Sequence, residues 1–292
     1  MQEIGNNIPQ ADINLVDETF DSSQSAGYHL SIQTEGDRLT FCVINTSINQ
    51  YIVLRSYSII NAGSGTLVDM CRSVFKTDEL LKLKYKSSSH LWVSSHFTFV
   101  PEHLFVPSEA KLYLTFNHGE LANEQMLYHY SRAANACHLF SCPDELMILL
   151  RNHHPDIYFF HHSKPFIESV MAGTSQTDKT ELAIFFYSCW LDIAVVKNKK
   201  MLFYNSFQIK APADSVYYLV GVSKMFDIEL SSTSLMFAGD LKQMPPEIEI
   251  LKNYVEQMVE CEPHNTFTYS HHITDSFRRN FINLINSYGC ES

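Results

Sequence analysis

Histidine is the residue type in this chain with the most potential for chemistry. There are 14 histidines, and six of them form the adjacent pairs His153-His154, His161-His162 and His271-His272. A metal site requires two or more such side chains to converge, with help from a carboxylate or thiolate. Neighbouring residues of a strand point to opposite faces, so neither His161-His162 nor His271-His272 is expected to chelate a metal alone. His153 and His161 would converge only if the turn through Pro155 folds back. We interpret the histidines as surface or loop residues and predict no metal site.

The cysteines indicate reduced thiols rather than a disulfide framework or a catalytic nucleophile. They are odd in number and never spaced as C-x-x-C: Cys42, Cys71, Cys137, Cys142, Cys189, Cys261 and Cys290. The sequence also lacks G-x-S-x-G, H-E-x-x-H and G-x-x-x-x-G-K-[ST]. We therefore predict no catalytic residue. The opening segment is polar and has no apolar signal-peptide core, so a cytoplasmic protein is expected.

Composition narrows the class of partner. The 292 residues are 45% hydrophobic and carry a net charge of −11, from 21 basic and 32 acidic side chains. Nucleic-acid binding is disfavoured, because it depends on Lys and Arg displacing counterions from phosphates. The richest basic cluster, Lys197–Lys200, falls where a hairpin turn is expected. No apolar run approaches the length of a membrane span, so none is predicted. The length favours two domains.

A repeated pattern organises the elements. Tyr28–Tyr57 and Glu181–Phe207 each indicate three short strands joined by tight turns, with Gly36-Asp37 forming the first turn. The first two strands start nine residues apart in both copies, at Leu30 and Leu39 and at Leu182 and Leu191. A helical stretch follows each copy. Such duplication implies two similar lobes with any ligand held between them.

The remaining segments alternate between helix and strand patterns. Helices are predicted over 66–81, 107–116, 143–152, 164–171, 212–225, 247–259 and 275–285, and further strands over 91–100, 125–130, 136–140, 156–161, 234–237 and 267–269. This alternation is typical of mixed α/β layers. We expect a polar N-terminal arm at 1–25, a first lobe at 26–172 and a second lobe at 173–292, with the linker-like Ala172–Lys179 at the boundary.

Two lobes that each open with three strands and a helix resemble the actin-like ATPase superfamily, which includes sugar kinases, actin and chaperone ATPases. Over roughly residues 25–290, the chain also resembles an uncharacterised Bacteroidetes domain-of-unknown-function family assigned to that fold. The resemblance implies an α/β protein built from duplicated ribonuclease H-like βββαβα lobes. It implies little about biochemistry, because the family itself has no known function.

The superfamily carries Asp-x-Gly in the turn between the first two strands of each lobe. The Gly lets backbone N–H groups approach phosphate oxygens, and the Asp positions Mg²⁺ or water. A typical second-lobe sequence is D-I-G-G-G-T-x-D-I-A-V. This chain keeps Asp192–Val195 in register, but Phe185 stands at the first Asp. The Gly positions hold Tyr187, Ser188 and Cys189.

The other two superfamily motifs are also altered. In the first lobe, Gln33 occupies the Asp position and Glu35 the Gly position. The late Gly pair against which adenosine packs is reduced to Ala238-Gly239. Losing the metal-positioning carboxylates removes the charge neutralisation that phosphoryl transfer depends on. We expect no ATPase turnover and no cofactor. Gly36, Ser188 and Gly239 are the cleft residues best placed to contact a ligand.

These patterns lead to one leading function and two alternatives. The leading hypothesis is a non-catalytic actin-like protein with degenerate phosphate-binding loops, acting as a scaffold or regulatory module for a protein partner. The main alternative is an atypical nucleotide or sugar-phosphate binder, or a weak ATPase. A ribonuclease H-type nuclease would need an Asp on the first strand to hold metal. Neither His29–Thr34 nor Glu181–Tyr187 offers one in its interior.

Overall fold

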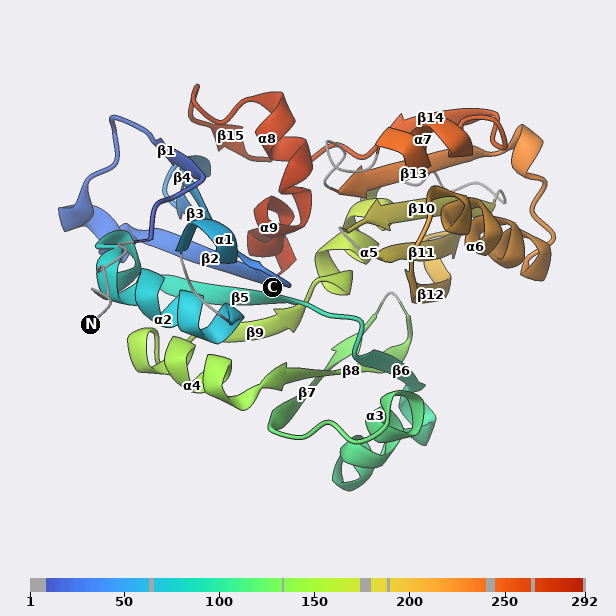
Figure 1. The fold of residues 1–292 in the computed structure, drawn as a ribbon, viewed down its shortest axis with the longest axis horizontal. Coiled ribbons are helices and arrows are strands. Elements are labelled where there is room, and N and C mark those ends of the chain that lie inside the picture. The colour runs from blue at the N-terminus through green and yellow to red at the C-terminus, as the bar shows by residue number, and fades with distance from the viewer. Residues whose placement is uncertain are drawn as a thin grey trace, which may run out of the picture.

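The computed structural model describes residues 9–62, 66–132, 134–173, 180–187, 190–239, 245–263 and 266–290. Two large sheets form two lobes, and a smaller third sheet lies below the second lobe (Figure 1). The predicted linker residues 174–179 lie outside the described part of the chain, as does Ser188. The fold is mixed α/β, as the alternation of patterns predicts.

The two large sheets share one strand order. The first contains β1 (Ile13–Val16), β2 (Tyr28–Glu35), β3 (Arg38–Asn45), β4 (Gln50–Ser58), β5 (Ser87–Val93) and β9 (Tyr158–His161), and the short β15 (Thr268–Tyr269) pairs with β4. The second contains β10 (Thr180–Phe186), β11 (Trp190–Lys197), β12 (Lys200–Gln208), β13 (Ser234–Gly239) and β14 (Gln257–Glu260). The order β4-β3-β2-β5-β9 of one sheet matches β12-β11-β10-β13-β14 of the other. The predicted duplication is confirmed at the level of topology.

Each large sheet is buried on both faces. Helices α2 (Leu67–Thr77) and α4 (Asp144–His153) cover one face of the first sheet, and α9 (Ile282–Ser287) covers the other. In the second sheet, helices α6 (Pro212–Met225) and α7 (Pro245–Leu251) cover one face and α5 (Ser163–Gly173) the other. The period-2 alternation of β10 sends Leu182, Ile184 and Phe186 to the α6 side and Ala183 and Phe185 to the α5 side. Burial on both faces explains why these strands are almost wholly apolar.

A small subdomain is inserted between β5 and α4. It consists of β6 (Phe97–Pro101), α3 (Ala110–His118), β7 (Glu124–Ser131) and β8 (Ala136–Pro143), with β8 at the centre of an antiparallel three-stranded sheet. Leu139 and Leu114 are fully buried within it. The short helix α1 (Ile59–Ala62) follows β4 in the first lobe.

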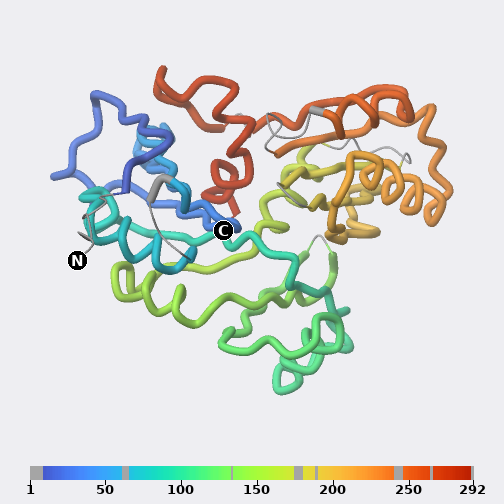
Figure 2. The backbone as a smooth tube through the Cα atoms, in the orientation of Figure 1, coloured from blue at the N-terminus to red at the C-terminus, as the bar shows by residue number. Residues whose placement is uncertain are grey.

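The C-terminal segment returns to the first lobe (Figure 2). After β14 the chain adds β15 to β4, and then forms α8 (Asp275–Asn280) and α9. Leu284 and Ile285 of α9 pack with Tyr51 and Leu54 of β4. A domain boundary near residues 172–173 stays a prediction. The polypeptide crosses between the lobes a second time near its end.

Several predicted elements differ in the structure. The helix predicted over 247–259 ends at Leu251, because Gln257–Glu260 pairs in parallel with β13 and forms β14. Ile13–Val16, predicted as part of a polar arm, is a strand paired with β4. The closing helix divides into α8 and α9 at Phe281, where φ is −112°. The strand predicted over 91–100 divides into β5 and β6. At β14, and at the division between β5 and β6, pairing with strands distant in the sequence overrides the local pattern.

The interpretation of the histidines as surface residues is wrong for several of them. His29 of β2 and His90 of β5 are both completely buried within the first sheet. His29 Nδ1 lies 2.8 Å from Ser87 Oγ, and His90 Nε2 lies 2.7 Å from Thr34 Oγ1. Strand hydroxyls hydrogen-bond to both rings, although His90 Nδ1 has no hydrogen-bond partner among the described residues. Burial lowers the pKa of both side chains to about 3.

These buried histidines predict acid-sensitive folding. An unfolded histidine titrates near its ordinary pKa of 6.5, so below that pH the unfolded chain binds protons that the folded chain refuses. Stability is fully present above pH 6.5 and falls as the pH drops toward 3, by about 1.4 kcal/mol per pH unit for each such histidine. Urea unfolding at several pH values from 7.5 to about 4.5 measures this slope.

A matched pair of variants tests whether buried histidines cause this dependence of the unfolding free energy on pH. His90→Gln removes one buried imidazole and should reduce the slope by about one proton, or 1.4 kcal/mol per pH unit. His103→Gln removes an exposed histidine and should leave the slope unchanged. Equal slopes in wild type and His90→Gln would contradict the assignment.

Candidate functional site

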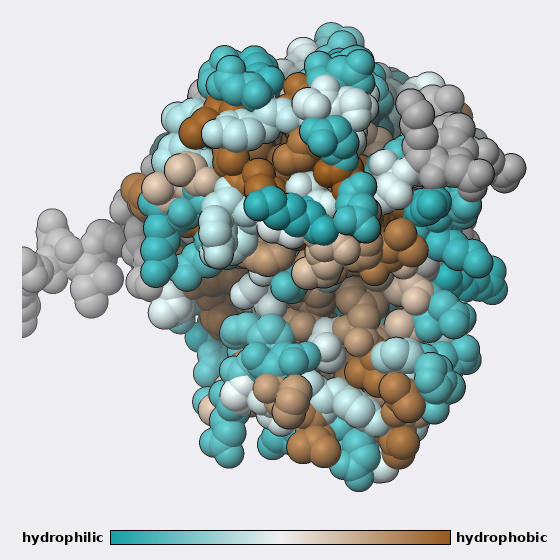
Figure 3. Space-filling view, turned by 90° about the vertical axis from the view of Figure 1, so that its right-hand side faces the viewer, coloured by the Kyte–Doolittle hydropathy of each residue, from teal (hydrophilic) through white to brown (hydrophobic). Residues whose placement is uncertain are grey.

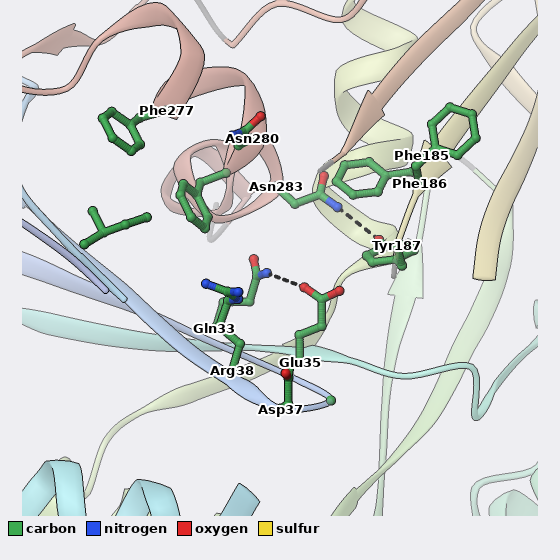
Figure 4. A pocket seen from close by; sticks show the side chains of 13 residues that line it. Gln33, Glu35, Asp37, Arg38, Phe185, Phe186, Tyr187, Phe277, Asn280 and Asn283 are labelled. Atoms are coloured by element: carbon green, nitrogen blue, oxygen red, sulfur yellow. Dashed lines mark hydrogen bonds between the residues drawn. The ribbon is translucent and has the colours of Figure 1, made fainter. Parts of the chain in front are cut away.

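A pocket of about 530 Å³ lies between the two lobes. Its walls are the β2–β3 turn of the first lobe, the end of β10 in the second lobe, and helices α8 and α9 (Figure 4). The lining residues are Ile13, Gln33, Glu35, Gly36, Asp37, Arg38, Phe185, Phe186, Tyr187, Phe277, Asn280, Phe281 and Asn283. The pocket therefore joins the same two strand ends that the sequence places at the phosphate-binding turns.

The first-lobe wall is a tight turn with charged side chains. Gly36 has φ of +47°, which a glycine adopts without strain, and it lines the pocket. Glu35 and Asp37 flank it, and Gln33 Nε2 donates a hydrogen bond to Glu35 Oε2 at 3.3 Å. The Nη1 atom of Arg38 on β3 lies 3.9 Å from Oδ2 of Asp12, which precedes β1 on the other side of β4. A phosphate entering here would meet two carboxylates and one guanidinium that already has an acidic neighbour.

Aromatic packing fills the second-lobe wall. Tyr187 is 2% exposed and stacks on Phe185 and Trp190, with ring centroids 4.7 Å and 5.1 Å away. Its backbone N–H donates to Trp190 O at 2.9 Å, which closes the β10–β11 connection. Asn283 Nδ2 of α9 lies 3.4 Å from the Tyr187 hydroxyl. Burial, followed by the charge of Asp192, raises the pKa of that hydroxyl well above its usual range. The ring thus fills the space beside the β10–β11 connection.

Gly239 has a packing role at the end of β13. Its φ is +116°, and a Cβ at this position would lie 2.2 Å from the carbonyl oxygen of Phe186. Only glycine allows β13 to approach the end of β10 this closely. Gly239 is not among the residues that line the interlobe pocket. Of the three ligand-contacting candidates, the structure thus brings Gly36 to the pocket, assigns Gly239 to strand packing, and does not describe Ser188.

A buried carboxylate lies behind the pocket. Asp192 of β11 is 0% exposed and accepts hydrogen bonds from the hydroxyls of Tyr204 and Ser206 on β12. His162, which directly follows β9 of the first lobe, donates from Nε2 to Asp192 Oδ2 at 2.7 Å. The backbone N–H of Ser94 donates to His162 Nδ1 at 3.3 Å, which places the proton of the neutral ring on Nε2. This network, named here the Asp192 network, joins the lobes.

The Asp192 network continues through two more histidines. His161 Nε2 donates to the carbonyl oxygen of Ser94 at 2.7 Å, and its Nδ1 lies 2.9 Å from Ser163 Oγ. Ser163 Oγ in turn lies 3.3 Å from His138 Nε2 of the inserted subdomain. Burial lowers the pKa of His138 and of His161 well below the usual range. The predicted surface location is wrong for His138, His161 and His162.

Sequence reasoning missed this network, although one signal was present. Asp192 is the single charged residue within the apolar run Leu191–Val196, and a charge on a strand buried on both faces requires partners. Its hydrogen-bond donors come from β12 and from the residue after β9, so no local spacing reveals them. The chemistry available here is hydrogen bonding between imidazoles and one carboxylate.

Known proteins were compared with this chain and this geometry. A family model described as a protein of unknown function, DUF3822, matches residues 17–258. A Bacteroides thetaiotaomicron protein, described as having an actin-like ATPase fold and unknown function, superposes with a TM-score of 0.76 at 23% identity, covering 83% of this chain and 93% of that one. The PilM–PilN type IV pilus biogenesis complex supplies a match with a TM-score of 0.57 at 10% identity, covering 90% of this chain and 99% of that one. No curated protein matches. The predicted actin-like ATPase fold is confirmed.

Disrupting the Asp192 network is expected to destabilise the fold. Asp192→Ala leaves two hydroxyls and an imidazole without their buried acceptor, which should cost about 3–5 kcal/mol of unfolding free energy. Glu79→Ala is the control, because the Glu79–Lys82 pair is solvent-exposed and worth about 0.3–0.5 kcal/mol. Urea unfolding of both variants at pH 7.5 measures the difference. A loss for Asp192→Ala as small as that of the control would contradict a structural role for the network.

Proposed function

We propose that this chain, which belongs to the DUF3822 family, is a non-catalytic actin-like protein that binds another protein as a scaffold or regulatory module. The observation that carries the proposal is the lining of the interlobe pocket. Carboxylates flank the first-lobe turn, and the Tyr187 ring occupies the second. The buried, unbridged thiols of Cys42, Cys71 and Cys142 accord with a reducing cytoplasmic location.

Electrostatics argue against a triphosphate in this pocket. Two like unit charges 4 Å apart repel by about 4 kcal/mol at an effective dielectric constant near 20. The lining contributes Glu35 and Asp37 against Arg38, whereas nucleotide sites offer net positive charge, bare backbone N–H groups and a metal-binding carboxylate. Six aromatic or aliphatic side chains complete the lining: Ile13, Phe185, Phe186, Tyr187, Phe277 and Phe281. Such a lining suits a peptide or protein segment better than a phosphate chain.

The inserted subdomain supplies a surface for a protein partner. Leu112 and Phe116 lie one helical turn apart on α3 and are 60% and 86% exposed. The nearby loop contributes Leu104 and Val106, at 57% and 48%, while Tyr128 of β7 is half exposed. Figure 3 shows apolar side chains on the lower part of this side of the molecule, with polar side chains between them. Exposed apolar groups that cluster on one element mark interaction sites, where aromatic residues contribute most binding energy.

A protein of similar fold is described in a complex with another protein. The PilM–PilN match has 10% identity, so it establishes fold similarity alone. It supports the proposal to the extent that an actin-like chain of this size can serve as one member of a protein complex. Among the residues that the structure describes, no helix has the length and apolar character needed to cross a membrane.

Nucleotide addition tests the non-catalytic part of the proposal. Mg-ATP at millimolar concentration is expected to leave the melting temperature unchanged and to release no phosphate above the background rate. A ligand at 100 times its dissociation constant would add about 2.7 kcal/mol of stability, which a thermal-shift assay detects. Sulfate at equal ionic strength is the control for general anion effects. Stabilisation with phosphate release would instead establish the alternative, an atypical nucleotide or sugar-phosphate binder.

Substitution on α3 tests the protein-binding part. Phe116→Asp should abolish capture of a stoichiometric partner from extract, because it puts a charge in place of the most exposed of these apolar side chains. Ile48→Asp is the matched control, since Ile48 is 58% exposed in the β3–β4 turn of the first large sheet, outside the inserted subdomain. Neither side chain is packed in a core, so both variants should retain the wild-type melting temperature. Loss of the partner in both variants, or in neither, would contradict this surface.

A further inference from the structure

Two distant chain segments meet at one edge of the first sheet. The backbone N–H of Asp17, directly after β1, donates to Ile52 O at 2.8 Å. The backbone N–H of Ser270, directly after β15, donates to Tyr51 O at 2.9 Å. Because Tyr51 and Ile52 are neighbours on β4, residues 17–18 and 270–272 are brought side by side, although about 250 positions separate them in the sequence.

Buried hydrogen bonds fix this junction. Asp17 is 8% exposed, and its carboxylate accepts from the backbone N–H of Thr19 at 2.9 Å and from the hydroxyl of Ser270. The hydroxyl of Ser270 also accepts from the backbone N–H of His272 at 3.3 Å. Ile273 N–H closes a turn onto Ser270 O at 2.9 Å. The His271-His272 pair therefore lies in a turn rather than on a strand, and its rings do not point to opposite faces.

Three metal-ligating side chains converge at the junction. Glu18 Oε1 lies 3.0 Å from His272 Nε2 and 4.0 Å from His271 Nε2. The two imidazole rings have centroids 3.9 Å apart, and the three ligand atoms all lie within 4.8 Å of one another. Zinc bonds of about 2.0–2.1 Å in a tetrahedron place neighbouring ligand atoms about 3.4 Å apart. The observed separations bracket that value, so small side-chain rotations suffice to enclose an ion.

We propose that Glu18, His271 and His272 form a zinc-binding site. Two imidazoles and one carboxylate are suitable ligands for zinc, and with three protein ligands the fourth position is left to water. An ion pair between Glu18 and His272 accounts for the 3.0 Å contact, but it does not account for the second imidazole directed at the same oxygen. The expectation that His271 and His272 lie on a strand and point to opposite faces is wrong, because the pair lies in a turn, and Glu18 offers a third ligand beside it.

Zinc at this position would connect two segments that lie far apart in the sequence. Glu18 follows β1, whose Ile13 lines the interlobe pocket. His271 and His272 precede α8, whose Phe277 and Asn280 line the same pocket. The ion would thus hold two walls of the pocket in a fixed relation. The site is distinct from the α3 surface and does not depend on the proposed function.

Metal titration of the untagged, chelator-treated full chain tests the site. We expect calorimetry with zinc chloride to show one ion per chain and the melting temperature to rise with zinc. Cobalt substitution should give the visible absorption bands of a tetrahedral site. Glu18→Gln and His272→Ala should each weaken zinc binding at least tenfold, since each removes one of three ligands. His103→Ala, an exposed histidine outside the site, should bind zinc as the wild type does.

The variants are interpretable because the ligands are on the surface. Glu18, His271 and His272 have side chains 71%, 70% and 36% exposed, so their substitution should not prevent folding. The zinc-induced shift of each variant is measured from its own metal-free melting temperature, which separates lost stability from lost binding. Absence of saturable zinc binding in the wild type would overturn the proposal. So would equal affinity in the wild type, Glu18→Gln and His272→Ala.

Discussion

The carboxylate of Asp192 constrains the geometry of both lobes. An isolated charge in a protein interior costs many kcal/mol, so it persists only when hydrogen-bond donors surround it. Here the donors are Tyr204, Ser206 and His162. Two come from the neighbouring strand of the second lobe, and the third comes from the end of β9 in the first. Because His162 must reach across to the carboxylate, the Asp192 network fixes where the two sheets meet. The shape of the interlobe pocket depends on this junction, because residues of both lobes line the pocket.

Duplication gives the two lobes the same sheet order, but their first turns have diverged. The β2–β3 turn keeps a glycine with positive φ and exposes charged neighbours to the pocket. The β10–β11 connection instead buries Tyr187 in an aromatic stack supported by Asn283. Sheet order is set by strand pairing and core burial, which tolerate these changes in the turns. What each turn can bind depends instead on its exposed backbone N–H groups and local charge, and these differ between the two lobes.

Local patterns predicted most elements because their signals are strong and short-range. Helix α6 begins and ends as predicted, with Pro212 at its first position, and the strand triplets follow from apolar alternation. Several of the failures involve contacts between distant segments. Val259 belongs to a strand because β13 pairs with it, and His161 is buried because Ser94 and Ser163 satisfy its ring. Of the pocket lining, the β2–β3 turn and the end of β10 could be anticipated. The wall formed by α8 and α9 could not, since nothing local shows that the chain returns to the first lobe.

Because the short C-terminal segment returns to the first lobe, it contributes to a sheet, a hydrophobic core and the interlobe pocket. Through β15 it extends the first sheet, through Leu284 and Ile285 it completes a core, and through Phe277 and Asn283 it lines the pocket. Glu18, His271 and His272 lie where this segment meets the strand that follows the N-terminal residues. Helix α3 packs on the third, smaller sheet. None of its residues lines the interlobe pocket or lies at this junction. A partner on α3 and an ion at the junction would therefore act on separate parts of the molecule. The inserted subdomain itself meets the two lobes through the Asp192 network, where Ser163 contacts His138, and through core packing of Phe97 and Phe140.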